Sequence, residues 1–187
     1  MNELEGRKEI IIYGKKLLDT GLVQGTWGNL SLRLDEDHLL ITPSGMNYRI
    51  LEPEDICKIE ISSGKYEGKR KPSSEKELHR LIMLNYPQAN AVIHTHSLYC
   101  QVFAAAQKKL PAIDPEFIKV CPLGLECTKH ELAGTVVLAQ EAVKTIGQSK
   151  GCLLGNHGVV LLGNSLSETL ALALSAESAA QDFLDRD

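Results

Sequence analysis

Two short strands joined by a tight acidic turn constrain the fold of this chain more than any other segment. Residues 30–34 alternate apolar and polar side chains, Asp35-Glu36-Asp37 follows as a turn, and residues 38–41 return as the partner strand. Strands joined by so short a turn pair antiparallel, because a parallel pair needs a much longer crossover. We therefore expect a central sheet that is largely antiparallel or mixed and is covered by helices.

Helices and further strands alternate along the rest of the chain. Apolar residues at helical spacing, between caps and stop residues, predict helices over 2–20, 73–86, 97–107, 128–146 and from 166 onward. Ser73 or Ser74, Thr128 and Ser165 are the expected N-caps of three of them. Short apolar runs predict strands over 56–61, 91–96, 117–121, 151–154 and 159–162. The 187 residues are expected to form one α/β domain over 1–187.

Composition argues against several classes of partner. The net charge of -4 does not indicate the positively charged surface that a nucleic-acid-binding protein needs. No apolar run is long enough to span a membrane, and the charged residues 1–7 do not begin a signal peptide. The five cysteines are scattered without a Cys-x-x-Cys pair, which indicates reduced thiols. We expect a cytoplasmic protein that binds neither nucleic acid nor membrane.

The apolar run 91–93 leads directly into two histidines one residue apart, His94 and His96. Alternate residues of a strand share a face, so the two imidazoles can converge on one ion. A zinc site needs at least one more protein ligand, and Glu75 and His157 are the candidates. Each lies between a turn signal and a regular element. The alternative interpretation is that all four are ordinary polar residues at element ends, but together they favour a metal site.

Three separate loops offer the small donors that bind a phosphate without much net charge. They are Gly28-Asn29, residues 42–45 and Ser73-Ser74. Each loop alone is equally typical of a plain turn or helix cap. Because Ser73-Ser74 directly precedes Glu75, a phosphate there would lie close to the metal. His79, one turn after Glu75, is interpreted either as a polar residue at a helix–sheet edge or as a partner of a ligand.

Five motifs, in this order and spacing, together resemble the class II aldolase and adducin family of metal-dependent sugar-phosphate aldolases and epimerases. The motifs are GTWGNLS at 25–31, ITPSG at 41–45, KPSSE at 71–75, HTH at 94–96 and NHG at 156–158. The resemblance covers nearly the whole chain. It implies a three-layer α/β fold and a lyase.

The resemblance also implies roles for individual residues. A divalent ion, usually zinc but also Mn²⁺ or Co²⁺, would be held by His94, His96 and His157. Glu75 would be the fourth ligand of the empty site and the proton-transferring group once substrate arrives. The substrate phosphate would be bound by Gly28, Asn29, Ser44, Gly45, Ser73 and Ser74. Four identical subunits would form a ring with the sites at their interfaces.

The implied reaction is the cleavage of a short, L-fuculose-1-phosphate-like sugar phosphate to dihydroxyacetone phosphate and an aldehyde. The ion would act as a Lewis acid on the substrate carbonyl and hydroxyl, so that the charge of the enediolate is neutralised where it develops. The alternatives are a sugar-phosphate 4-epimerase, dehydratase or decarboxylase on the same metal site. From a different class, a non-catalytic interaction module like the adducin head is also open.

One departure from the aldolase pattern concerns the acid on the aldehyde side. No tyrosine occurs after Tyr99, and Asp114-Pro115-Glu116 stands in the neighbourhood where an aldolase carries one. The acid on that side is therefore open, with Glu116 or a water as candidates. Glu75 stands where the epimerases carry aspartate, which favours an aldolase.

Overall fold

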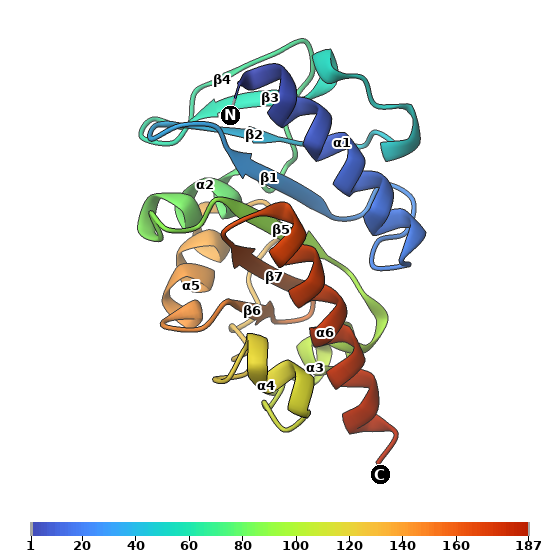
Figure 1. The fold of residues 1–187 in the computed structure, drawn as a ribbon. Coiled ribbons are helices and arrows are strands. Elements are labelled where there is room, and N and C mark those ends of the chain that lie inside the picture. Colours follow the sequence, from blue (N-terminus) through green and yellow to red (C-terminus); the bar gives the residue numbers. More distant parts are fainter. Residues whose placement is uncertain (1, 187) are drawn as a thin grey trace.

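An antiparallel sheet of seven strands forms the centre of the computed structural model, which describes residues 2–186 (Figure 1). The strands are β1 (Asn29–Arg33), β2 (His38–Ile41), β3 (Cys57–Glu60), β4 (Tyr66–Glu67), β5 (Ala91–Thr95), β6 (Gly151–Leu154) and β7 (Gly158–Gly163). Their order across the sheet is β4-β3-β2-β1-β5-β7-β6, and each neighbouring pair is antiparallel. The expectation of a largely antiparallel sheet is confirmed.

The hairpin predicted from the alternating residues is confirmed as β1 and β2. Ser31 pairs with Ile41, and the amide of His38 donates to Asp35 Oδ1 at 2.8 Å within the acidic turn. The strand that leads into the two histidines, β5, lies in the middle of the sheet between β1 and β7. All of its residues are buried because helices cover both faces of the sheet there.

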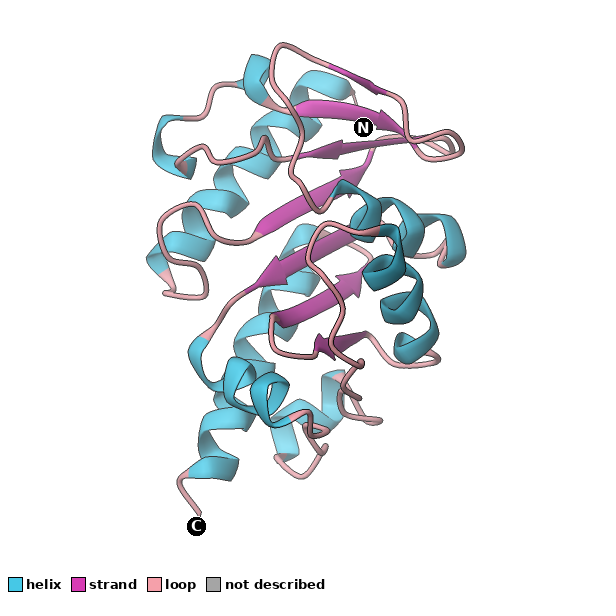
Figure 2. Cartoon of the chain, turned by 180° about the vertical axis from the view of Figure 1, so that it is seen from behind, coloured by secondary structure: helices cyan, strands magenta, loops and turns pink. Residues whose placement is uncertain are grey.

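Helices form a layer on each face of the sheet, which makes the three-layer fold (Figure 2). They are α1 (Glu3–Asp19), α2 (Lys76–Asn85), α3 (Leu98–Ala106), α4 (Pro115–Val120), α5 (Val136–Ile146) and α6 (Leu166–Leu184). Helices α2 and α5 share one hydrophobic core with the sheet, and α1, α3, α4 and α6 share the other. Successive residues of β5 enter opposite cores, Val92 the first and Ile93 the second.

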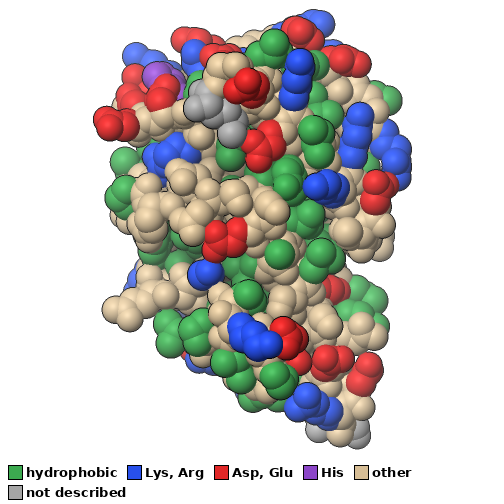
Figure 3. Space-filling model, in the orientation of Figure 1, with side chains coloured by type: hydrophobic (Ala, Val, Ile, Leu, Met, Phe, Trp, Pro, Cys, Tyr) green, Lys and Arg blue, Asp and Glu red, His purple; other side chains and the backbone are tan. Residues whose placement is uncertain are grey.

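The surface carries charges of both signs without a large area of one sign on the face shown in Figure 3. This face includes α1, which carries acidic and basic side chains, and α6, whose charged side chains are acidic. Within residues 2–186, none of the helices has the length and apolar character needed to cross a bilayer.

Residues 117–121 do not form the expected strand, and that prediction was wrong. Most of them belong to α4, which begins after Asp114, whose side chain accepts a hydrogen bond from the amide of Phe117 at 2.7 Å. Pro115 occupies the first turn of the helix, where a missing N–H costs nothing. An aspartate N-cap followed by proline is a helix start signal, and it outweighs the short apolar run.

The helix expected to begin after Thr128 begins only at Val136, with Thr135 as its N-cap. Thr128 is buried, and its hydroxyl accepts a hydrogen bond from the amide of Gly155 at 3.0 Å. The threonine therefore connects its own segment to the turn between β6 and β7 by a hydrogen bond instead of capping a helix. The capping-box pattern misled because the contact of Thr128 is with a residue distant in sequence.

The start of α2 also differs from the expectation. The helix begins at Lys76, so that Glu75 and not Ser73 or Ser74 occupies the N-cap position. The hydroxyl of Ser73 instead accepts a hydrogen bond from the amide of Glu75 at 3.2 Å. Ser165 does cap α6, as predicted, by accepting from the amide of Glu168.

Candidate metal centre

Four side chains converge where β5 ends. One ligand atom from each of Glu75, His94, His96 and His157 can be chosen so that all four atoms lie within 4.8 Å of one another. His94 is on β5, His96 follows its end, His157 is in the turn before β7, and Glu75 precedes α2. The antiparallel register pairs Thr95 with Val159, which brings the turn containing His157 beside the end of β5.

Hydrogen bonding orients the first imidazole of the cluster. Nδ1 of His94 donates to the carbonyl oxygen of Val159 at 3.0 Å, which leaves the lone pair of Nε2 directed at the other ligands. Nε2 of His94 lies 2.9 Å from Nε2 of His96 and 3.0 Å from Oε2 of Glu75. Nε2 of His157 lies 3.4 Å from Oε1 of Glu75. The three imidazole rings contact one another edge to face.

The donor set fits a divalent ion. Oε1 of Glu75 and Nδ1 of His157 are the buried side-chain polar atoms in residues 2–186 that have no hydrogen-bond partner. Leaving such an atom unpaired costs about 1–3 kcal/mol, and a cation among the four side chains removes that cost for the carboxylate. Three imidazoles and a carboxylate are ligands that suit zinc and similar borderline ions.

The electrostatics of the cluster also favour a cation at neutral pH. Burial, together with the neighbouring imidazoles, lowers the pKa of His96 and of His157 to about 4. Burial alone would raise the pKa of Glu75, but His94, His157 and the Asn29 amide outweigh it and hold that pKa well below its usual value. The two imidazoles are therefore neutral and the carboxylate is charged at pH 7, as metal ligands must be.

A cavity of about 210 Å³ opens beside the four ligands. Its walls include all the residues expected to bind phosphate, namely Gly28, Asn29, Ser44, Gly45, Ser73 and Ser74. The loop after β2 and the segment before α2 reach it together, because the amide of Ser44 donates to Lys71 and the amide of Ser73 donates to Thr42. Neither lysine nor arginine is among the residues that line the cavity.

Asn29 has a second set of contacts that the sequence did not indicate. Its Nδ2 donates to Oε2 of Glu75 at 3.0 Å, and its Oδ1 faces Nε2 of His79 at 2.5 Å. The antiparallel register of β1 and β5 places Asn29 opposite His94, which brings the amide to the metal ligands. The pairing of the two strands is the signal that could have revealed this contact.

Two glycines allow the backbone to approach the histidines from both sides. A Cβ atom at Gly28, which has a φ of +103°, would lie 2.9 Å from the carbonyl oxygen of His94. A Cβ atom at Gly158 would lie 2.3 Å from the carbonyl oxygen of Thr95 and 3.2 Å from the ring of His94. Only glycine permits these approaches, because it has no Cβ atom. The GTWGNLS and NHG motifs therefore need glycine at these two positions for close packing.

The cavity has three wall residues that sequence reasoning did not select, Thr26, Trp27 and Ala133. The indole of Trp27 is 65% exposed, and its ring centroid lies 6.4 Å from that of His96. Ala133 reaches the cavity because residues 128–135 are not helical. The backbone of Gly134 packs closely against Ser74, since a Cβ atom at Gly134 would lie 2.9 Å from the carbonyl oxygen of Ser74. This contact places the segment beside the start of α2.

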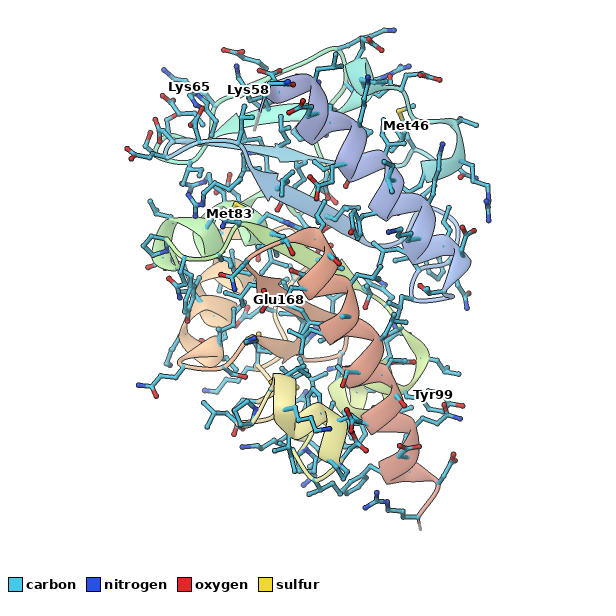
Figure 4. All side chains as sticks on the ribbon, in the orientation of Figure 1. Met46, Lys58, Lys65, Met83, Tyr99 and Glu168 are labelled. Atoms are coloured by element: carbon cyan, nitrogen blue, oxygen red, sulfur yellow. The ribbon has the colours of Figure 1, made fainter. Side chains whose placement is uncertain are left out.

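The candidate for the aldehyde-side acid, Glu116, does not line the cavity of its own chain. It lies on α4, where it is exposed and forms an ion pair with Lys119. Tyr99, the last tyrosine of the sequence, is on α3 (Figure 4), where its amide donates to Glu177 of α6 at 2.7 Å. Tyr99 does not line the cavity either.

Known proteins resemble this chain over nearly all of its length. The family described as "Class II Aldolase and Adducin N-terminal domain" matches residues 8–184. A 5-deoxy-D-ribulose 1-phosphate aldolase of Bacillus thuringiensis serovar kurstaki is 35% identical over 178 residues, which cover 95% of this chain and 83% of that protein. An L-fuculose phosphate aldolase of Haemophilus influenzae is 35% identical over 184 residues, covering 98% and 84%. The solved structure of an L-fuculose 1-phosphate aldolase gives a TM-score of 0.92 at 32% identity, covering 96% and 85%.

The converging ligands predict about one divalent ion per chain in the purified protein. His94→Ala and His157→Ala should each lose it, because each removes a neutral imidazole from the set. Elemental analysis by mass spectrometry checks the metal content, and His38→Ala, at the start of β2, is the matched control that should retain the ion. Stoichiometric metal in both ligand variants would contradict the assignment.

Proposed function

Because the chain belongs to the class II aldolase and adducin family and is a lyase of that family, we propose that it cleaves a ketose 1-phosphate to dihydroxyacetone phosphate and an aldehyde. The observation that carries the proposal is that one cavity is lined both by three of the four candidate metal ligands, Glu75, His96 and His157, and by the small donors suited to a phosphate. Relatives are named for L-fuculose phosphate and for 5-deoxy-D-ribulose 1-phosphate. Both are deoxyketose phosphates, so an L-fuculose-1-phosphate-like deoxyketose is the substrate class that we propose.

The chemistry requires one proton to be removed and another to be delivered. The bond between C3 and C4 of the ketose breaks, the C4 hydroxyl loses its proton, and C4 becomes the aldehyde carbon. The electron pair remains on C3 as an enediolate, which becomes dihydroxyacetone phosphate when C3 receives a proton. Glu75 is the proposed carrier of the C3 proton, since it is an anionic carboxylate that lines the cavity.

His94, His96 and His157 would hold the metal, for which zinc is our proposal and Mn²⁺ or Co²⁺ are the alternatives. When bound, such an ion supplies Lewis-acid stabilisation of negative charge on substrate oxygens. The protein's own contribution is to hold the carboxylate of Glu75 beside these ligands. Its Oε2 accepts from Asn29, while Oε1 has no hydrogen-bond partner among the described residues and remains available to a substrate proton.

The substrate phosphate would be bound at the start of α2. Ser73 and Ser74 lie just before Glu75, the N-cap residue of the helix, whose free N–H groups and dipole attract an anion. Ser44 and Gly45 would add donors from the facing loop, and neither lysine nor arginine is among the described residues that line the cavity. This arrangement supports recognition of a phosphate by hydrogen bonds more than by charge.

The acid on the aldehyde side of the site is the reason to propose an oligomer. Glu116 lies outside the cavity of its own chain, so it would have to act across a subunit boundary, with a water as the alternative acid. A homotetramer with sites at the interfaces is the assembly we propose. The five cysteines are all free, which supports the proposed cytoplasmic location.

A tetramer is expected in sedimentation equilibrium at micromolar concentration. Exposed apolar side chains on α3 and α5, such as Leu98 and Val137, are the candidate contacts. A mass equal to one chain of 20.5 kDa across that concentration range would contradict the proposed assembly.

Replacing Ser73 and Ser74 together by alanine should raise the Michaelis constant for a phosphorylated substrate by at least about tenfold, since each hydrogen bond to a charged group contributes about 1.5–3 kcal/mol. Steady-state kinetics with fuculose 1-phosphate checks this. Ser63→Ala, in an exposed turn, is the matched control. If unphosphorylated sugars turn over as well as phosphorylated ones, the phosphate assignment is wrong.

Glu75→Gln should retain the ion, because three histidines remain, but should lose proton transfer at carbon. The expected loss is about a hundredfold to ten-thousandfold. The measurement is exchange of a carbon-bound hydrogen of dihydroxyacetone phosphate with heavy water, followed by proton NMR. This half-reaction needs no aldehyde-side acid. Absence of exchange in the metal-loaded wild type would exclude the aldolase proposal and leave a different reaction on the same residues.

A further inference from the structure

A chain of buried polar side chains leads from the core to Glu75. Oγ of Ser31 lies 2.7 Å from Nδ1 of His79, and Nε2 of His79 lies 2.5 Å from Oδ1 of Asn29. Nδ2 of Asn29 then donates to Oε2 of Glu75 at 3.0 Å. Ser31 and His79 have no exposed surface, and Asn29 is 5% exposed. Bulk water therefore does not compete for these hydrogen bonds, and breaking one leaves a buried polar atom without a partner.

The hydrogen positions along this chain follow from the charge of Glu75. An ionised carboxylate only accepts, so Asn29 turns its NH₂ group to Glu75 and its carbonyl oxygen to His79. That oxygen also only accepts, so Nε2 of His79 carries a hydrogen. Burial, with the nearby His94, lowers the pKa of His79 to about 3, and the ring is therefore neutral at pH 7. Nδ1 of the neutral ring then accepts from the hydroxyl of Ser31.

We propose that His79 and Ser31 are positioning residues that act through Asn29 to hold Glu75 for proton transfer. Ser31 donates to Nδ1 of His79 and so stabilises the Nε2–H tautomer, whose hydrogen holds Oδ1 of Asn29 and prevents the amide from turning over. If the amide turned over, its carbonyl oxygen would face the carboxylate and repel it. With Oε2 of Glu75 held in this way, Oε1 is the oxygen left to exchange a proton with substrate carbon.

This inference rests on the proposed function and adds that Glu75 must be held in one orientation for the proton transfer. The geometry of the carboxylate is set by a helix and a strand at once, since Asn29 and Ser31 are on β1 and His79 is on α2. A side chain that only filled the space between α2 and the sheet would stabilise the fold without affecting the rate. Measuring the rate, the Michaelis constant and the metal content on the same variants distinguishes a positioning role from a purely structural one.

The test compares His79→Gln with His79→Met. A glutamine amide can donate where Nε2–H donates, whereas methionine has similar length and no donor. His79→Met is expected to lower kcat for exchange of dihydroxyacetone phosphate in heavy water by about ten- to a hundredfold. The Michaelis constant and the metal content should be unchanged, and His79→Gln should recover most of the rate. If both variants exchange at the wild-type rate, or if glutamine is no better than methionine, the inference is overturned.

A second measurement is independent of activity. Nitrogen-15 NMR of the purified protein should show Nε2 of His79 protonated and Nδ1 unprotonated, with the resonances assigned by their absence in His79→Gln. Ser31→Ala should shift the Nδ1 resonance and reduce kcat less than His79→Met does. Protonation at Nδ1 in the wild type would overturn the inference. Absence of exchange in the wild type with the Nε2–H tautomer present would instead reject the proposed function.

His38→Gln is the control for replacing a histidine. His38 is the first residue of β2 and contacts Asp35, outside the cavity and the chain of hydrogen bonds. Its rate, Michaelis constant and metal content should equal those of the wild type. Should His79→Met fail to fold, Ser31→Ala and the NMR measurement decide the inference, because the serine change removes only a hydroxyl.

Discussion

The pairing of β5 with β1 on one side and with β7 on the other is the constraint on which the rest of the site depends. This register fixes Asn29 and Val160 on either side of His94. It also fixes the carbonyl of Val159 where it receives the hydrogen of His94 Nδ1. A slip of one residue would turn every side chain of β5 to the other face, and His94 would enter the opposite core without ligands around it. The apolar residues that hold the register therefore also hold the metal ligands.

The buried polar groups around Glu75 are stable because almost every one has a partner. Burial of an unpaired polar group is costly, and the site buries the carboxylate of Glu75, the imidazoles of His79 and His94 and the amide of Asn29, while His96 and His157 are partly buried. Hydrogen bonds to Val159 and Ser31 remove this cost from His94 and His79. The polar atoms that keep this cost of burial, Oε1 of Glu75 and Nδ1 of His157, belong to the side chains around the expected cation. Unpaired polar atoms at such a place are typical of a functional site.

Much of the fold followed from local patterns, and the errors came where a distant contact decided the structure. Alternation in the hairpin and the apolar run before His94 predicted β1, β2 and β5 because neighbours along the chain dictate them. Thr128 had the local signature of an N-cap, but its hydroxyl is bonded to Gly155. The contact of Asn29 with Glu75 was missed for the same reason, since it depends on which strands are neighbours. The error at α4 was different, because the local signals of Asp114 and Pro115 marked a helix there and the short apolar run was given more weight than they were.

Because neither lysine nor arginine lines the cavity among the described residues, the proposed phosphate site and the proposed metal site would depend on each other. A phosphate there would lie near the anionic Glu75, with hydrogen-bond donors but no fixed positive side chain to offset the repulsion. A bound cation reduces that repulsion, so the ion strengthens anion binding. By thermodynamic reciprocity a phosphorylated ligand strengthens retention of the ion by the same factor. Metal affinity in such a site is not a constant of the protein but rises with the concentration of its substrate.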